Sequence, residues 1–328
     1  QEELMDSLIR IIAGSIDAKS AYTGGHCERV PELATMLAEA ATQQTQGALA
    51  DFRFSTEDEW REFRIGAWLH DCGKVTTPEY VVDKATKLET IYNRIHEVRT
   101  RFEVLLRDAE IAALRAIAAG ADAPSTWEAF AEQKRQLHED FAFLAECNVG
   151  GEFLAPQNIA RIQAIAQRTW WRHFDDRLGL SSEEVRRMAQ GPAGELPVLE
   201  TLLADKPGHI VPRGTSKALD AKHGFAVAVP EHLYNHGEVY NLSIARGTLN
   251  QEERFKINEH IIQTIVMLEQ MPFPKHLRRV PEYAGTHHES LIGTGYPRKL
   301  QGQALSVPSR IMAIADIFEA LTASDRPY

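Results

Sequence analysis

The sequence has few cysteines, no long apolar run and no excess of positive charge, and each shortage argues against a class of protein. Its three cysteines, Cys27, Cys72 and Cys147, form no Cys-x-x-Cys pair, which predicts a reducing, cytoplasmic environment. No run of about 18 apolar residues occurs, so no segment of this sequence is predicted to span a membrane. With 36 Lys and Arg against 46 Asp and Glu, the net charge of −10 argues against binding polymeric nucleic acid or an acidic membrane face.

What is present is typical of a globular protein. Hydrophobic residues make up 44% and charged residues 25% of the 328 residues, enough for one large or two ordinary domains. The sequence opens without Met or a signal peptide, directly in an amphipathic helix that contains Leu4, Leu8 and Ile11. We therefore expect a fragment of a longer protein, with sensor domains upstream of it.

Two pairs of adjacent residues, His70-Asp71 and His287-His288, are the strongest chemical signal in the chain. Each pair joins an imidazole to a second potential metal ligand, and few structural roles require such neighbours. Imidazole mixed with carboxylate suits Fe, Mn, Ni or Zn better than Mg or Ca. Because a carboxylate beside an imidazole can also bridge two cations, the pairs predict a dinuclear centre, the usual apparatus for cutting phosphate esters.

The candidate ligands lie on segments with the apolar periodicity of helices. One such face ends near Gly73, which places His70-Asp71 at a helix C-terminus. Apolar residues at helical spacing also surround His260 and Asp316. A buried carboxylate without a partner is costly, so Asp316 is expected to pair with a cation. A single helical histidine is usually structural, and the candidates therefore gain weight only as a set: His26, His70, Asp71, His260, His287, His288 and Asp316.

These motifs resemble those of a known family. The order of His26, His70-Asp71 and Asp316 is similar to that of the HD superfamily of metal-dependent phosphohydrolases. Members of its HD-GYP subfamily are typically bacterial phosphodiesterases that open cyclic di-GMP to the linear dinucleotide pGpG and sometimes to GMP. The chain resembles this subfamily over roughly residues 10–90 and 245–328, through His70-Asp71-Cys72-Gly73-Lys74, His287-His288-Glu289, Gly295-Tyr296-Pro297, Ala315-Asp316 and Arg326-Pro327-Tyr328.

The resemblance implies a role for each matching residue. Asp71 would bridge two divalent first-row metal ions, with Fe or Mn expected first and Ni or Zn as alternatives. Lys74 would contact the scissile phosphate, although a lysine at a helix end can also be merely solvated. Tyr296 and Arg326 would belong to the substrate-binding surface. The resemblance makes the remaining candidates metal ligands: His26, His70, His260, His287, His288 and Asp316.

Three positions depart from the family pattern. Ile292 stands where an Asp is expected before Gly293, and we expect this to alter the loop more than the metal content. Tyr22 takes the place of a Glu that helps some members to hold a third metal, which favours a two-metal site. The segment that leads to Arg326 is one residue longer than usual, which leaves the assignment of that arginine open.

A long insertion is the largest departure. In the family a short segment separates the HD helix from the next histidine ligand, whereas here the pattern breaks after Lys84 and resumes at Arg246. His96 then competes with His260 for the ligand role, but the spacing from Glu253 favours His260. The predicted domains are the two parts of a catalytic domain, 1–87 and 246–328, and an insertion, 88–245.

The insertion is expected to be mainly helical. Helices are predicted over 91–119, 127–147 and 157–174, with Trp170, Trp171 and Phe174 in the core at the base of a hairpin. The near-heptad apolar stripe of the first helix needs a partner, so a homodimer is expected. Residues 191–216 should form a loop and 225–229 either a strand or a buried segment, while four histidines are expected in loops or at the surface: His209, His223, His232 and His236.

The sequence thus predicts an all-α fold, an HD-type helical bundle with a long, mainly helical insertion. The predicted function is metal-dependent hydrolysis of a cyclic dinucleotide, with cyclic di-GMP as the expected substrate. Two alternatives stay open. Ile292 allows another cyclic dinucleotide or phosphoester as the substrate, and the insertion allows a non-catalytic sensing or scaffold module. The intact ligand set argues against the second alternative.

Overall fold

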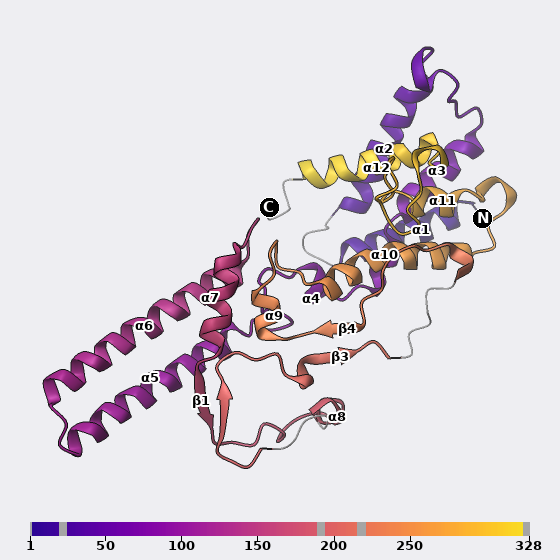
Figure 1. Cartoon of the computed structure of the whole chain (residues 1–328). Coiled ribbons are helices and arrows are strands. Elements are labelled where there is room, and N and C mark those ends of the chain that lie inside the picture. The colour runs from indigo at the N-terminus through magenta and orange to yellow at the C-terminus, as the bar shows by residue number, and fades with distance from the viewer. Residues whose placement is uncertain (1, 20–24, 189–193, 215–220, 324–328) are drawn as a thin grey trace. The chain divides into compact units, whose positions relative to one another are not determined.

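The computed structural model describes residues 2–19, 25–188, 194–214 and 221–323, and the chain forms two compact units. Unit 1 comprises residues 1–83, 215–229 and 254–328, and unit 2 comprises residues 84–214 and 230–253. The chain therefore leaves unit 1 and returns to it twice (Figure 1). The predicted domain boundaries at 87 and 246 stay a prediction, because compact packing does not by itself define a family domain.

Unit 1 is built from helices joined by turns and short 3-10 helices. No described helix of either unit is long and apolar enough to cross a membrane. In chain order, the elements of unit 1 are α1 (Glu2–Asp17), α2 (His26–Thr42), η1 (Gly47–Leu49), α3 (Glu57–Leu69), η2 (Cys72–Thr76), α4 (Glu79–Val82), η4 (Ala221–His223), α10 (Gln251–Glu269, in this unit from Arg254), η5 (Lys275–Leu277), α11 (Val280–Gly285), η6 (Gly302–Ala304) and α12 (Val307–Thr322).

A capping box fixes the start of α3, the helix that leads to the HD motif. Thr56 Oγ1 accepts a hydrogen bond from the Glu59 amide, and the Glu59 carboxylate accepts one from the Thr56 amide. This reciprocal arrangement satisfies two amides that have no partner within the helix. The helix ends at Leu69, so His70 and Asp71 lie at its C-terminus as predicted.

The helices of unit 1 pack around apolar clusters that lie close to the predicted ligands. α2 packs against α12, α3 packs against α11, and α1 contacts both α2 and α3. One cluster joins Val30 of α2, Phe63 of α3, Tyr283 of α11 and Met312 of α12, all of which are buried. Since each of these helices also carries or adjoins a candidate ligand, packing of the cluster brings the ligand-bearing segments together.

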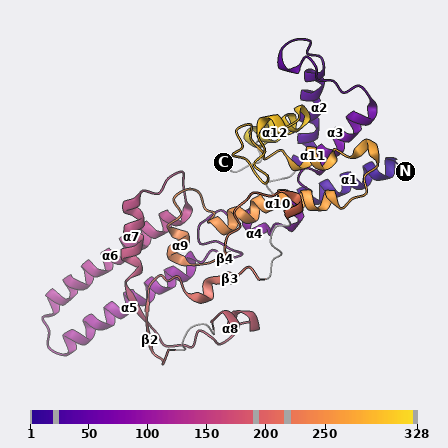
Figure 2. The same ribbon diagram turned by 45° about the vertical axis from the view of Figure 1, so that its right-hand side comes forward.

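Unit 2 contains a long helical hairpin and all the β-strands of the described residues. Helices α5 and α6 run side by side and are joined by a short turn (Figures 1 and 2). The antiparallel pairs β1–β2 and β3–β4 form two separate sheets. The elements of unit 2 are α5 (Ile95–Ala118), α6 (Ala123–Val149), α7 (Pro156–Ala166), β1 (Thr169–Arg172), α8 (Ser182–Met188), β2 (Val198–Thr201), η3 (Pro207–His209), β3 (Ile210–Pro212), β4 (His232–Asn235) and α9 (Glu238–Leu242).

The predicted all-α class is confirmed, but the prediction for the third helix of the insertion is wrong beyond Ala166. Residues Thr169–Arg172 form a strand that pairs with Val198–Thr201, a stretch predicted to be loop. Trp171 is 49% exposed and Phe174 is 86% exposed, so neither belongs to the core, and Trp170 is only partly buried. A strand places successive side chains on opposite faces, which turns Trp171 outward while Trp170 is partly covered.

The apolar stripe of α5 has its partner within the same chain. Val98 and Phe102 are buried and pack with Leu137 and Leu144 of α6. Ile91, where the predicted stripe began, precedes the helix and is 90% exposed. The argument that this stripe needs a second copy therefore does not hold, and the homodimer stays a prediction without that support.

Candidate metal centre

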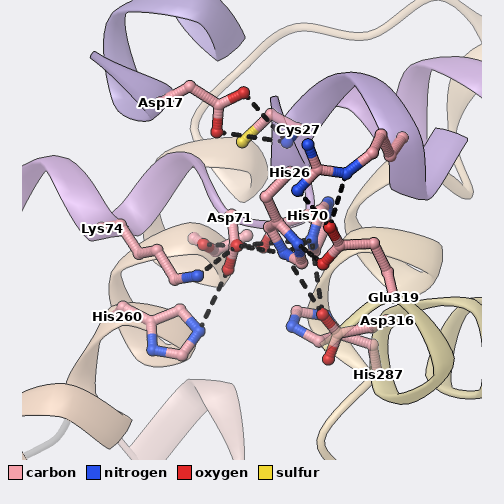
Figure 3. Close-up of polar contacts among 12 residues, drawn as sticks. Asp17, His26, Cys27, His70, Asp71, Lys74, His260, His287, Asp316 and Glu319 are labelled. Carbon is pink, nitrogen blue, oxygen red and sulfur yellow. Dashed lines mark hydrogen bonds and ion pairs between the residues drawn. The ribbon is translucent and has the colours of Figure 1, made fainter. Parts of the chain in front are cut away.

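The structure brings all the predicted metal ligands together within unit 1. His26 begins α2, His70 and Asp71 follow α3, and His260 lies in α10. His287 and His288 follow α11, and Asp316 lies in α12. Figure 3 shows side chains from these separate elements pointing toward one another around Asp71. Ligands distant in sequence thus meet because the helices that carry them pack together.

The ligand atoms fall into three overlapping groups, each with its atoms within 4.8 Å of one another. One group contains His26, His70 and Asp316 at one end of the site. A second contains His260, His287 and His288 at the other end, and the third joins His70, Asp71 and His287. Two groups of donors linked through a shared set are what a pair of cations requires.

Asp71 lies between the two ends of the site. Its Oδ2 is 3.2 Å from His26 Nε2 and 3.4 Å from His70 Nε2. Its Oδ1 is 3.3 Å from His260 Nε2. The two oxygens of one carboxylate therefore face different histidine groups, which is the arrangement of a bridging ligand.

Local hydrogen bonds orient several of the histidine rings. In His70, His260 and His287, Nδ1 lies 2.7, 2.6 and 2.9 Å from the backbone carbonyl of the residue three positions earlier. A ring whose Nδ1–H donates to a carbonyl keeps Nε2 as the free ligand atom. Nε2 of His287 is buried and has no hydrogen-bond partner in the described part of the chain. Because buried polar atoms rarely lack a partner, this atom fits a metal ligand.

Glu319 completes the environment of His26 and was not among the predicted site residues. Its Oε2 is 2.5 Å from Nδ1 of His26, and its Oε1 accepts a hydrogen bond of 2.7 Å from Arg29 Nε. A carboxylate behind a ligating histidine fixes the ring and raises its basicity. Glu319 lies one helical turn after Asp316 on α12, so the i, i+3 spacing is the sequence signal that could have identified it.

The pKa values of three candidate histidines differ between the two ends of the site. Although burial disfavours a charged ring, hydrogen bonds with Asp316 and Asp71 raise the pKa of His26 to about 10. Burial and the neighbouring His70 lower the pKa of His287 to about 4, and burial with His287 lowers the pKa of His288 well below its usual value. The lowered pKa values of His287 and His288 favour neutral imidazole, the form that ligates metals.

Lys74 contributes a positive charge at the edge of the site. Its Nζ is 2.5 Å from Asp71 Oδ2. Burial opposes the ammonium, but the carboxylate of Asp71 outweighs this and raises the pKa of Lys74. Lys19 was not predicted from the sequence, yet its Nζ donates to the carbonyl oxygens of Lys74, Val75 and Thr77 at 3.1, 2.8 and 2.5 Å. These bonds hold the turn on which Lys74 stands.

Gly73 allows the HD motif to approach α10 closely. A Cβ at this position would lie 1.9 Å from the carbonyl oxygen of His260 and 2.5 Å from the amide of Thr264. The Gly73 amide donates to Thr264 Oγ1 at 2.9 Å, and that hydroxyl donates to the His70 carbonyl at 3.2 Å. This contact sets the position of His260 relative to Asp71.

Gly73→Ala is therefore expected to destabilise the protein by about 2–3 kcal/mol, because a methyl group in a packed contact forces the backbone apart. The affinity for a metal ion at the His260 end of the site should also fall, because α10 would move. Urea unfolding and elemental analysis measure the two effects. Gly14→Ala is the matched control, since a Cβ there meets nothing within 4 Å and alanine favours a helix. Equal stability of the two variants would contradict the assigned contact.

The predicted substrate-binding tyrosine lies against the ligands. The Tyr296 ring stacks on His288, with centroids 4.8 Å apart and an interplanar angle of 17°. Gly295 precedes it where a Cβ would lie 2.4 Å from the Ser290 amide, so the turn requires glycine. Ile292, the departure from the family pattern, is 79% exposed on the same loop and forms an isolated bridge with Gln301. Its effect on loop order stays a prediction.

Three other predicted residues are not in the described site. Tyr22 and Arg326 lie outside the described residues, so the third-metal argument and the substrate role of Arg326 stay predictions. His96 is exposed near the start of α5 in unit 2, whereas His260 lies in the ligand cluster. The geometry therefore favours His260 over His96.

Comparisons with known proteins agree with the resemblance to HD-domain phosphodiesterases. Residues 197–328 match the model of an HD domain. The chain is 51% identical to the 3'3'-cGAMP-specific phosphodiesterase 1 of Vibrio cholerae over 82 residues, which are 25% of this chain and 18% of that protein. A cyclic di-GMP phosphodiesterase of the same bacterium is 38% identical over 82 residues, 24% of this chain and 17% of that protein.

A shorter match links the chain to a protein of another bacterium. The cyclic di-GMP phosphodiesterase response regulator of Xanthomonas campestris is 50% identical over 42 residues, 13% of this chain and 11% of that protein. Each of these matches spans less than a fifth of the relative. The matched HD model includes His260, His287-His288 and Asp316, and the structure joins these residues to His26 and His70-Asp71. By its motifs and these matches, the chain contains an HD domain over residues 197–328 and is similar to HD-GYP phosphodiesterases.

Proposed function

We propose that this chain is a metal-dependent phosphodiesterase that hydrolyses a cyclic dinucleotide, with cyclic di-GMP opened to pGpG as the first candidate reaction. The observation that carries the proposal is the position of Asp71, whose two carboxylate oxygens face different histidine groups. The names of the matched relatives, which are cyclic di-GMP and 3'3'-cGAMP phosphodiesterases, support the substrate class.

The donor set fits two divalent first-row cations. His26, His70 and Asp316 would hold one cation, and His260, His287 and His288 would hold the other. Asp71 would bind both. Imidazole mixed with carboxylate favours Fe or Mn, with Ni or Zn as alternatives, over Mg or Ca. The orphaned Nε2 of His287 supports this assignment, because a bound cation would supply its missing partner.

When bound, the cations would supply Lewis-acid charge and a water activated for attack on phosphorus. The remaining chemistry falls to side chains of the chain. Lys74 places an ammonium at the edge of the site, where it would stabilise negative charge on the scissile phosphate as that charge develops. Glu319 holds the His26 ring from behind, and Tyr296 presents an aromatic ring beside His288 that would line a base or ribose pocket.

The substrate within the class is the second part of the proposal. One set of relatives is named for 3'3'-cGAMP and another for cyclic di-GMP, so both dinucleotides are candidates. Both carry the same two-phosphate ring and differ at one base, so the metal centre cannot distinguish them and the base pocket must. The exposed Ile292 on the GYP loop is a candidate site for such a difference.

A turnover assay on metal-analysed protein tests the proposal. Protein loaded with Mn²⁺, or with Fe²⁺ under anaerobic conditions, would be mixed with cyclic di-GMP, 3'3'-cGAMP and cyclic di-AMP, and products separated by chromatography. We expect a linear dinucleotide from at least one guanine-containing substrate, and EDTA should abolish its formation. If fully metal-loaded protein bound a dinucleotide without cleaving it, the proposed function would change from enzyme to sensor. Cleavage of 3'3'-cGAMP alone would move the substrate assignment.

A further inference from the structure

One segment of the predicted insertion packs against the turn Gly295-Tyr296-Pro297, here called the GYP turn. Residues Ala221–Val229, here called the returning segment, lie in the predicted insertion but belong to unit 1. In Figure 1 this segment runs beside α10. It forms no strand, and the prediction of a strand or a buried run at 225–229 is wrong, since only Phe225 and Val227 are partly buried.

Apolar contacts attach the returning segment to α10. Phe225 and Val227 pack against a buried cluster of α10 that also contacts the Tyr296 ring. Alternate residues of the segment therefore face α10, while Ala226 and Ala228 are exposed. The cluster consists of Ile261, Ile262 and Ile265.

Polar contacts attach the same segment to the residues that follow Tyr296. The Ala226 amide donates to the Pro297 carbonyl at 2.7 Å. Arg298 donates from Nε to the His223 carbonyl at 2.7 Å and from a terminal nitrogen to Glu269 at 2.8 Å. His223, predicted to be a loop or surface residue, is buried, and its Nδ1 is 2.6 Å from the Glu269 carboxylate. The burial of the His223 ring and its bond to Glu269 mark a specific contact, because burying an imidazole without a hydrogen-bond partner would be costly.

The turn held in this way contacts a candidate ligand, His288. The Tyr296 amide donates to the His288 carbonyl at 3.1 Å, and the two rings stack. His288 Nε2 is in turn 3.2 Å from His260 Nε2. A short series of contacts therefore runs from the returning segment through Pro297 and Tyr296 to the second group of histidines.

We propose that the returning segment is a positioning element for the metal centre: by holding Pro297 and Arg298 it fixes Tyr296, and through Tyr296 the His288 ring. The insertion thus contributes to the active site without supplying a ligand. This inference rests on the proposed metal centre, with His288 as a ligand of the second cation. Orienting partners behind ligands typically change metal affinity by about 10–100-fold.

Proline substitutions at adjacent exposed positions test the hold on the turn. Ala226→Pro removes the N–H that donates to Pro297, whereas Ala228→Pro adds the same ring two residues later, where no backbone hydrogen bond is recorded for the described residues. In metal-free protein, we expect hydrogen–deuterium exchange of residues 288–302 to quicken at least tenfold in Ala226→Pro and to stay unchanged in Ala228→Pro. Arg298→Ala, with the exposed neighbour Lys299→Ala as its control, should act in the same direction without a proline.

Metal titration and kinetics test the consequence for the ligand. Ala226→Pro and Arg298→Ala should bind the second Mn²⁺ about 10–100-fold more weakly than wild type and keep the first. At saturating Mn²⁺, kcat should return toward the wild-type value because added metal refills the site. KM should stay raised, because Tyr296 remains displaced from the substrate. If wild-type protein bound fewer than two Mn²⁺, the proposed metal centre would be wrong. The hydrogen–deuterium exchange of the variants would then still test whether the returning segment holds the turn. Wild-type exchange and affinity in both variants would overturn the positioning role.

Discussion

Asp71→Ala is expected to lower the metal content from roughly two ions per chain to less than one and to reduce turnover by at least about three orders of magnitude. The two oxygens of this carboxylate face His26 and His70 on one side and His260 on the other, so its removal takes a ligand from both cations at once. Burial opposes the charge of Asp71, but Lys74 and His70 outweigh it and hold its pKa well below the usual range. The carboxylate is thus available as an anion at neutral pH.

Asp316→Ala is the matched comparison for this variant. Asp316 lies near His26 and His70 and belongs only to the first group of ligands, so its loss should weaken one cation and spare the other. Elemental analysis after dialysis, together with turnover of the best substrate, measures both variants. Full metal retention in Asp71→Ala, or an equal loss in the two variants, would rule out a bridging role.

Lys74→Ala is expected to lower kcat by about 10²–10³-fold and to change KM by less than tenfold, because a charge aimed at the scissile phosphate acts mainly as negative charge develops in the transition state. Metal content should stay near the wild-type value, since lysine is not among the ligands. The steady-state kinetics of metal-analysed protein give this result directly.

Two further variants make the test of Lys74 specific. Lys74→Arg keeps the charge but changes its geometry, and should retain part of the activity. Lys275→Ala removes an exposed ammonium of unit 1 and should change neither kcat nor KM. If Lys74→Ala raised KM and left kcat unchanged, the lysine would bind the substrate without stabilising the transition state.

The sequence alone identified the candidate ligands that the structure brings together, because their chemical types and local order can be seen without knowledge of the fold. His70-Asp71 at the end of an amphipathic helix, and His260 and Asp316 within two others, are local features that apolar periodicity reveals. The choice of His260 over His96 also followed from local spacing.

The pairing of distant segments lay beyond the sequence. Thr169–Arg172 is a strand because it pairs with Val198–Thr201, and short strands depend on their neighbours more than on intrinsic preference. The apolar stripe of α5 gave its own position but not its partner, so a second copy was expected where α6 of the same chain packs. Periodicity shows which face of an element is buried and carries no information about what covers it.

The sequence by itself therefore determined the helical class, the types of the candidate ligands and the helices that carry them, because these depend on residues near one another in the chain. Only the tertiary structure placed Asp71 between two histidine groups, put Glu319 behind His26 and brought the returning segment against Pro297. Each of these contacts joins residues from distant parts of the chain. Their geometry is set by the packing of whole helices, which no local pattern specifies.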